Sequence, residues 1–232
     1  MKILALDTTS GACSVALHCD GHTFEQFVAA ERDHTRRLLP MVDAVLAEAG
    51  IGLRQLDALA VSRGPGSFTG LRIAISCTQG LAFAAELPVV PVSSLAALAA
   101  GSRRAHPEWQ SGAIVAALDA RMQQVYWGIY ADACPHDSLL PEAVADPQRV
   151  LEALQQSELP APLYGAGPGW HYDALSVAPL ASVDLQAAIH AREIADLALP
   201  LWQKGEAVGA EALEPLYLRN EVTWQKRQKI RS

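Results

Sequence analysis

The feature that most constrains the fold of this chain is a short internal repeat. Residues 5–8 read Ala-Leu-Asp-Thr, and residues 117–120 read Ala-Leu-Asp-Ala, far apart in a chain of 232 residues. At each copy an apolar run ends at Asp, a polar turn follows, and a second apolar run begins. This pattern is typical of a β-hairpin. Its recurrence after half the chain predicts that one type of domain occurs twice.

The segments around the first copy alternate between strand and helix patterns. Asp20-Gly21 is typical of a two-residue hairpin turn, which predicts an antiparallel meander of three strands at residues 2–7, 13–20 and 22–30. Apolar residues at helical spacing then predict a helix, a buried strand follows, and a second helix over 71–87 is apolar almost all round. Pro40 disfavours helix around it, so the first helix is expected to be regular only from near Leu38.

The second copy opens a looser version of the same alternation, with a long helix expected over residues 185–205. Two halves that each begin with an Asp-bearing meander and then alternate helix and strand predict an α/β protein. We expect the duplicated actin-like, ribonuclease-H-like fold. The N-terminal domain is placed at 1–106 and the second domain at 107–232, with the polar, turn-rich residues 101–112 as the linker.

Charge and cysteine content narrow the class of protein. The net charge of −7 argues against nucleic-acid binding by the chain alone, because such affinity comes mostly from Lys and Arg on phosphates. No segment reaches the roughly 20 apolar residues of a membrane span, and the first residues are too polar for a signal peptide. Four cysteines without CxxC spacing are typical of a reduced, cytoplasmic protein.

The segment 62–72, Ser-Arg-Gly-Pro-Gly-Ser-Phe-Thr-Gly-Leu-Arg, joins a predicted strand to a predicted helix. Glycines at such a junction can cradle a phosphate, but Leu71 stands where a P-loop needs Lys, and the third glycine is one place late for a dinucleotide fingerprint. We therefore interpret the segment as a tight corner, with Ser67 or Thr69 as the helix N-cap. Phosphate binding is the alternative.

The first hairpin offers weak candidates for nucleotide binding. In actin-like ATPases such a hairpin wraps phosphates, and here its residues are Asp7, Thr8, Thr9 and Ser10. The equivalent turn of the second copy, 119–124, is too bulky for a phosphate hairpin. Because an ATP site of this fold needs both hairpins, we favour a locally satisfied turn and expect no cofactor.

Two further clusters could carry chemistry. Residues 18–22, His-Cys-Asp-Gly-His, contain metal-ligand types but straddle a tight turn, so surface turn residues are favoured over a metal site. The basic end, residues 223–232, is expected to be solvated, with contact to nucleic acid as the alternative.

Several segments together resemble one family: residues 4–17, 33–50, 56–99, 117–130 and 214–221. From Met1 to about Glu221 the chain is similar to bacterial TsaB, also called YeaZ, the non-catalytic paralogue of TsaD. The resemblance implies a scaffold that binds TsaD, and through it TsaE, for threonylcarbamoylation of the adenosine next to the anticodon of ANN-reading tRNAs. It implies contact with tRNA only within that complex.

The same resemblance implies that the transferase centre is absent. The metal-binding HxxxH of TsaD falls here on Ser94 and Leu98, and neither side chain replaces imidazole. No third-ligand Asp motif of the TsaD kind follows near the C-terminus. We therefore expect a protein without metal and without catalytic residues. The alternative is an ATPase or transferase that uses Asp7, Thr9 and Asp119, and tight nucleotide binding would favour it.

The resemblance also implies where the partner binds. In the family, the helices beginning near His34 and Phe68 form a four-helix contact with the same pair in TsaD. The expected interface residues are Leu38, Val42, Val45, Phe68, Leu71, Ala74, Ile75, Thr78 and Leu81. Such an exposed stripe would also let the chain form a homodimer when TsaD is missing. If Val42 faces outward, Val42→Glu should break partner binding and spare the fold.

Overall fold

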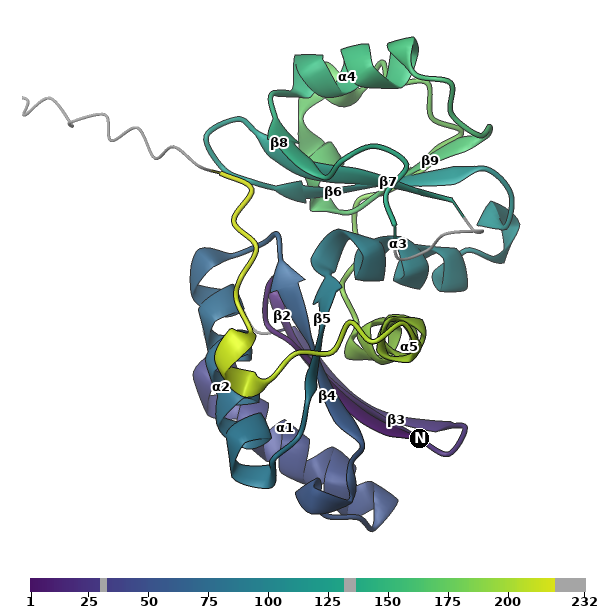
Figure 1. Cartoon of the computed structure of the whole chain (residues 1–232). Coiled ribbons are helices and arrows are strands. Elements are labelled where there is room, and N and C mark those ends of the chain that lie inside the picture. The colour runs from purple at the N-terminus through teal and green to yellow at the C-terminus, as the bar shows by residue number, and fades with distance from the viewer. Residues whose placement is uncertain (30–32, 132–136, 220–232) are drawn as a thin grey trace, which may run out of the picture.

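The computed structural model describes residues 1–29, 33–131 and 137–219, and these form two five-stranded sheets with helices around and between them (Figure 1). The basic end at 223–232 lies outside the described residues. In the described ranges, no helix is long and apolar enough to cross a membrane.

The first sheet has the order β3-β2-β1-β4-β5. Its strands are β1 (Lys2–Asp7), β2 (Ala12–Cys19), β3 (His22–Ala29), β4 (Ala58–Gly64) and β5 (Val89–Ser93). The antiparallel pairs β1–β2 and β2–β3 confirm the predicted meander, and β4 and β5 continue the sheet in parallel with β1. Asp20 and Gly21 have φ angles of 50° and 88°, as the predicted hairpin turn requires.

The second sheet repeats this topology. Its strands are β6 (Ala113–Asp119), β7 (Val125–Ala131), β8 (Ala143–Ala145), β9 (Leu163–Ala166) and β10 (Ser182–Asp184). Read from the other edge its order is β8-β7-β6-β9-β10, with an antiparallel meander and two strands parallel to β6. Each strand thus occupies the place of its counterpart in the first sheet. The predicted duplicated actin-like, ribonuclease-H-like fold is confirmed.

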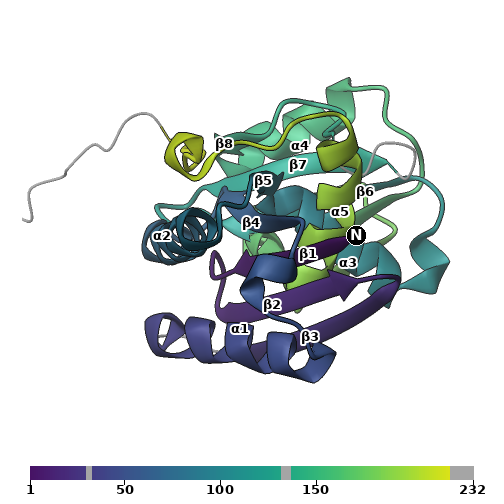
Figure 2. The same cartoon turned by 60° about the horizontal axis from the view of Figure 1, so that its bottom comes forward.

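The helices form three layers with the sheets between them (Figure 1). They are α1 (His34–Ala49), α2 (Phe68–Ala85), α3 (Ser94–Ala105), α4 (Pro147–Gln156) and α5 (Ala191–Gln203). Short 3₁₀ turns lie at Leu53–Gln55, Pro107–Trp109, Pro168–His171, Asp173–Leu175 and Ala210–Ala212. The pair α1 and α2 covers the outer face of the first sheet (Figure 2), and α4 packs on the outer face of the second. Between the sheets lie α3 and α5.

The central layer joins both halves into one apolar core. Ile3 and Ala60 of the first sheet and Ile114 of the second share this core with Leu95 of α3 and Ile194 of α5. The last helix therefore returns to the first sheet, across the sequence boundary expected at 106/107. The expected linker is also shorter, because α3 continues to Ala105. Likewise α5 begins at Ala191 rather than near residue 185.

The expected late start of the first helix is wrong. Helix α1 is regular from His34 and contains Pro40 in its interior. Pro40 is exposed, so water can reach the backbone carbonyl that lacks its N–H partner there. At the other end, Gly50 stops the helix with a left-handed φ of 67°, as a C-terminal glycine commonly does.

Candidate functional site

The glycine-rich corner between β4 and α2 is held by its own hydroxyl. Ser67 is the N-cap of α2, and its side chain accepts a hydrogen bond from the backbone N–H of Gly70 at 3.3 Å. A capping hydroxyl satisfies one of the free N–H groups in the first helical turn. The predicted corner is confirmed, with Ser67 rather than Thr69 as its cap.

This corner packs directly onto the first hairpin. Thr8 Oγ1 donates to the carbonyl of Gly70 at 2.6 Å, and the Ser67 N–H donates to the carbonyl of Thr9 at 2.8 Å. A Cβ on Gly66 would lie 2.6 Å from the Thr9 oxygen, and one on Gly70 would overlap the Thr8 oxygen. The glycines are therefore needed for contact with protein backbone, and the corner covers the hairpin that wraps phosphates in related folds.

The hairpin carboxylate is fully enclosed. Asp7 is buried, and its Oδ1 accepts from the Thr9 N–H at 3.2 Å and from Thr9 Oγ1 at 2.6 Å. Its Oδ2 has no hydrogen-bond partner within the described residues. Burial raises the pKa of this carboxyl above its usual range, although the nearby Ser62 hydroxyl and the Thr9 bonds act against the shift. Thr8 and Thr9 are buried as well, and Ser10 is half-buried.

We expect Asp7→Asn to stabilise the protein increasingly as pH rises. A carboxyl whose pKa is raised by folding stabilises the native state at low pH, and this contribution is lost as pH rises from the usual pKa of 3.8 toward the raised value. Asn does not titrate, so the advantage of the variant should grow by up to about 1.4 kcal/mol per pH unit in that window. Urea unfolding of both proteins at a series of pH values measures it. A difference independent of pH would contradict the enclosed carboxyl.

The Asp119 carboxylate of the second hairpin bonds to neighbouring protein groups. Asp119 Oδ1 accepts from the Arg121 N–H at 2.8 Å and from the Tyr172 hydroxyl at 2.9 Å, while its Oδ2 lies 3.0 Å from Arg121 Nη1. Residues Arg121, Met122 and Gln123 all have left-handed φ angles of 55° to 60°. Asp119 thus stabilises its own turn.

The two positions at which the resemblance to TsaD would place metal ligands do not fit a metal. Ser94 and Leu98 lie on α3, one turn apart, and both are buried. The Ser94 hydroxyl lies 3.3 Å from Thr9 Oγ1, and the Leu98 side chain packs against Gly167. Leu has no donor atom. Elsewhere, His18 Nδ1 lies 3.8 Å from Asp196 Oδ1, and within the ranges described no cluster of His, Cys, Asp or Glu could hold a metal.

The expected interface stripe mostly faces the core. Seven of its residues are buried against the first sheet, and for these the prediction of an exposed stripe is wrong: Leu38, Val42, Val45, Leu71, Ala74, Ile75 and Thr78. The helical spacing of these residues identifies the side of α1 and α2 that packs on the sheet, whereas the prediction placed that side at the surface. Val42 is 2% exposed, so Val42→Glu would disrupt the fold itself. Leu81 is half-buried, and Phe68 is exposed as expected.

The outer side of the same two helices nevertheless carries apolar surface. Leu39 on α1 is 50% exposed, and Phe68 and Phe83 on α2 are 56% and 81% exposed. Between the helices runs an open groove of about 590 Å³, whose walls include Leu39, Ile73 and Cys77. Burial raises the pKa of the Cys77 thiol, which keeps this thiol uncharged. We call this surface of α1 and α2 the outer helix face.

Small residues line the outer helix face along α2. Ser76, Gly80 and Ala84 are exposed one turn apart, and nothing lies within 4 Å of where a Cβ on Gly80 would be. Small side chains at this spacing let another helix approach closely. The sequence contained a signal for this face: α2 is apolar almost all round, so the apolar and small positions left after the core stripe must face outward.

One end of the outer helix face is closed by the C-terminal segment. The Arg72 guanidinium lies 3.8 Å over the Phe68 ring, and Arg72 Nε donates to the Tyr217 hydroxyl at 3.3 Å. The rings of Phe68 and Tyr217 are 5.7 Å apart. These contacts fix Phe68 in place although it is exposed.

Comparison with known proteins identifies a family that this chain matches. Residues 28–221 match the family model "TsaD: tRNA N6-adenosine threonylcarbamoyltransferase". The chain is 42% identical to the tRNA threonylcarbamoyladenosine biosynthesis protein TsaB of Escherichia coli, covering 97% of this chain and 98% of that protein. It is 39% identical to the TsaB protein of Haemophilus influenzae, covering 97% of each.

Solved structures agree with these relatives. The structure described as YeaZ from Pseudomonas aeruginosa superposes with a TM-score of 0.83 at 42% identity, covering 94% of this chain and 99% of that one. A second structure, described as an uncharacterized protein with similarity to peptidase YEAZ from Pseudomonas aeruginosa, gives a TM-score of 0.85 at 43% identity with the same coverage.

Proposed function

Because this chain belongs to the TsaB proteins of the TsaD family, we propose that it serves tRNA threonylcarbamoyladenosine biosynthesis as a non-catalytic subunit. In this proposal it binds a TsaD-type partner and, through it, TsaE. The substrate is the adenosine next to the anticodon of ANN-reading tRNAs, which the assembled complex binds. The protein acts in the cytoplasm.

The observation that supports this role best is the outer helix face. Three large apolar side chains, Leu39, Phe68 and Phe83, are exposed on these helices. Leu39 and Phe68 also line the groove, together with Arg72. Exposed apolar surface gathered over two helices is typical of a protein–protein interface. The small residues along α2 suit a partner that presents helices of its own. Without the partner, two copies of this chain would cover the same face in a homodimer.

The two hairpins argue against the alternative of an ATPase or transferase. The corner is packed onto the hairpin of Asp7 and Thr9, and Asp119 is bonded to its own turn and to Tyr172. A phosphate at the first hairpin would have to displace the corner, whose backbone is hydrogen-bonded there. The residues at the TsaD ligand positions do not fit a metal. We therefore assign catalysis to the partner.

Reconstitution tests this role directly. We expect the purified chain, given tRNA, threonine, bicarbonate and ATP, to form no threonylcarbamoyladenosine, because no described site fits the transfer chemistry. Adding the TsaD and TsaE proteins and the enzyme that supplies the threonylcarbamoyl group should restore modification, which mass spectrometry of digested tRNA detects. Leaving this chain out of the full mixture should abolish most of the product. Modification by the chain without TsaD, or full modification when the chain is omitted, would refute the role.

A further inference from the structure

A C-terminal strap, residues 208–219, runs from the first sheet along α2 to the second hairpin (Figure 1). On its way, Gln79 Nε2 of α2 donates to the Leu213 carbonyl at 3.1 Å. Further along, a Cβ on Gly64 would lie 2.7 Å from the Leu216 carbonyl oxygen, so the strap lies directly on the end of β4. These contacts fix the path of the strap between the outer helix face and the second half of the protein.

The strap ends by holding the turn of the second hairpin, residues 120–124. Arg219 Nη2 donates to the Ala120 carbonyl at 3.0 Å and to Gln124 Oε1 at 2.8 Å, so one side chain contacts both ends of the turn. Three successive residues inside the turn have left-handed φ angles without being glycine, a conformation that L residues rarely adopt. Strain of this kind persists where surrounding contacts impose it, and it is found mainly at functional sites.

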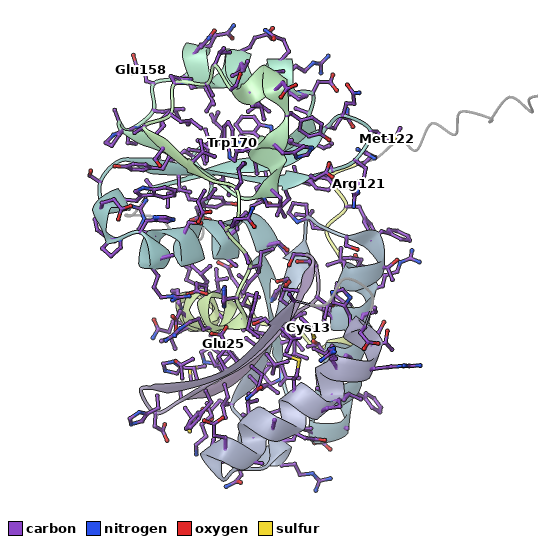
Figure 3. All side chains as sticks on the ribbon, turned by 180° about the vertical axis from the view of Figure 1, so that it is seen from behind. Cys13, Glu25, Arg121, Met122, Glu158 and Trp170 are labelled. Atoms are coloured by element: carbon purple, nitrogen blue, oxygen red, sulfur yellow. The ribbon has the colours of Figure 1, made fainter. Side chains whose placement is uncertain are left out.

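The strained turn presents two side chains to solvent (Figure 3). The Arg121 side chain is 87% exposed, and Met122 is 60% exposed. Each is anchored at one point, because Arg121 Nη1 lies 3.0 Å from Asp119 Oδ2 and Met122 Sδ lies 3.2 Å from Arg219 Nη1. Both side chains are therefore positioned by protein contacts while most of their surface stays accessible.

Tyr217 of the strap connects this turn to the outer helix face. It is 41% exposed, its hydroxyl accepts from Arg72 Nε at 3.3 Å, and its ring lies 5.7 Å from the Phe68 ring. Two residues further along the strap, Arg219 reaches the turn. The side chains thus form one continuous surface, which we call the strap patch: Phe68, Arg72, Arg121, Met122, Tyr217 and Arg219.

The composition and charge of the strap patch indicate what it binds. Aromatic side chains, Met and Arg are the residues enriched in protein–protein interfaces. The groups that hold Arg72 are an aromatic ring and a hydroxyl, and those that hold Arg219 are a carbonyl, an amide and a thioether, all of them uncharged. These contacts leave two positive charges uncompensated in a chain whose net charge is −7. A protein segment that carries carboxylates complements such a surface.

We propose that the strap patch is a second contact for the protein that binds the outer helix face, and that it receives an acidic segment of that protein. The inference rests on the proposed function and adds to it a contact from the second half of the chain. The two surfaces share Phe68 and Arg72, so one partner can cover both without a gap. Because Arg219 already holds the turn, little ordering is needed when the partner binds.

Calorimetric titration of the full chain with the TsaD protein tests this contact. Met122→Ala should weaken binding about tenfold, as loss of a central interface side chain does. Arg121→Glu should weaken it by at least as much, and its effect should shrink between about 50 and 500 mM salt because the lost attraction is screened. The matched controls Val177→Ala and Arg149→Glu make the same changes at exposed positions away from the strap and should bind normally. Thermal unfolding of each variant checks its fold.

Leu39→Glu in the same assay separates this inference from the proposed function, because it changes the outer helix face alone. If Leu39→Glu weakens binding whereas Met122→Ala and Arg121→Glu behave like their controls, the strap patch is not a contact and the proposed function stands. Loss of affinity in Arg121→Glu that is the same at both salt concentrations would overturn the acidic segment. Normal binding by Leu39→Glu with weakened binding by both patch variants would support the strap patch and refute the role of the outer helix face.

Discussion

Replacing Leu39 with Glu should weaken the binding of this chain to a TsaD-type partner by a hundredfold or more while leaving its fold intact. Leu39 is half-exposed on the wall of the α1–α2 groove, so the new carboxylate stays in water in the free chain. In an apolar interface it would be buried without a partner, which costs on the order of 3–5 kcal/mol. Each 1.4 kcal/mol is about tenfold in affinity. Calorimetry measures the affinity, and thermal unfolding measures the stability.

Two other substitutions serve as controls for Leu39→Glu. Val177→Glu places the same charge at an exposed apolar position of the other half and should change neither affinity nor stability. Val42→Glu places it in the core beneath the outer helix face and should unfold the chain. If Leu39→Glu binds the partner as tightly as the unaltered chain does, the partner sits on another surface, and the role assigned to the outer helix face is wrong.

Gly70→Ala should strongly destabilise the chain, although it adds only one methyl group. A Cβ at this position would overlap the carbonyl oxygen of Thr8, which is backbone and cannot rotate away. Either the corner or the first hairpin must shift, and the Thr8 hydroxyl bond to Gly70 would be lost. We expect a loss of at least about 3 kcal/mol of unfolding free energy, or failure to fold. Urea unfolding of the purified variant, or its recovery in the soluble fraction, measures the effect.

The matched control is the same substitution three turns further along the same helix. Gly80 has open space where its Cβ would be, so Gly80→Ala should stabilise the chain by about 1 kcal/mol through helix propensity alone. A Gly70→Ala protein as stable as Gly80→Ala would show that the corner does not press on the hairpin.

The sequence specified the fold well where local chemistry decides it. The hairpin turn at Asp20-Gly21, the cap at Ser67 and the stop at Gly50 each depend on neighbouring residues, and all three form as expected. The duplicated topology was predictable because both halves repeat the same alternation. The effect of Pro40 on the start of the first helix was predicted wrongly. Pro40 is exposed, so water can hydrogen-bond the backbone carbonyl that lacks an N–H partner.

Which side of a helix faces solvent depends on the elements that pack around it. Local sequence patterns were therefore insufficient to predict the exposed side. In α2 both sides are apolar, so periodicity identified a stripe without showing that Ala74 and Ile75 face the sheet and Phe83 faces solvent. The return of α5 to the first sheet and the path of the strap are contacts between distant segments. Nothing in residues 191–203 or 208–219 alone indicates which sheet they meet.

The position of α5 between the sheets has a consequence for how the protein is made. Ala5 and Ala60, on the inner face of the first sheet, share their core with Ala195 and Ala198. A ribosome therefore finishes the first five strands long before it releases the helix that covers them. Although each half descends in pattern from one repeat, the first cannot complete its core from its own residues. Folding must wait for nearly the whole chain, which is slower than closing local contacts. Because both halves share this core, we expect them to unfold as a single cooperative unit.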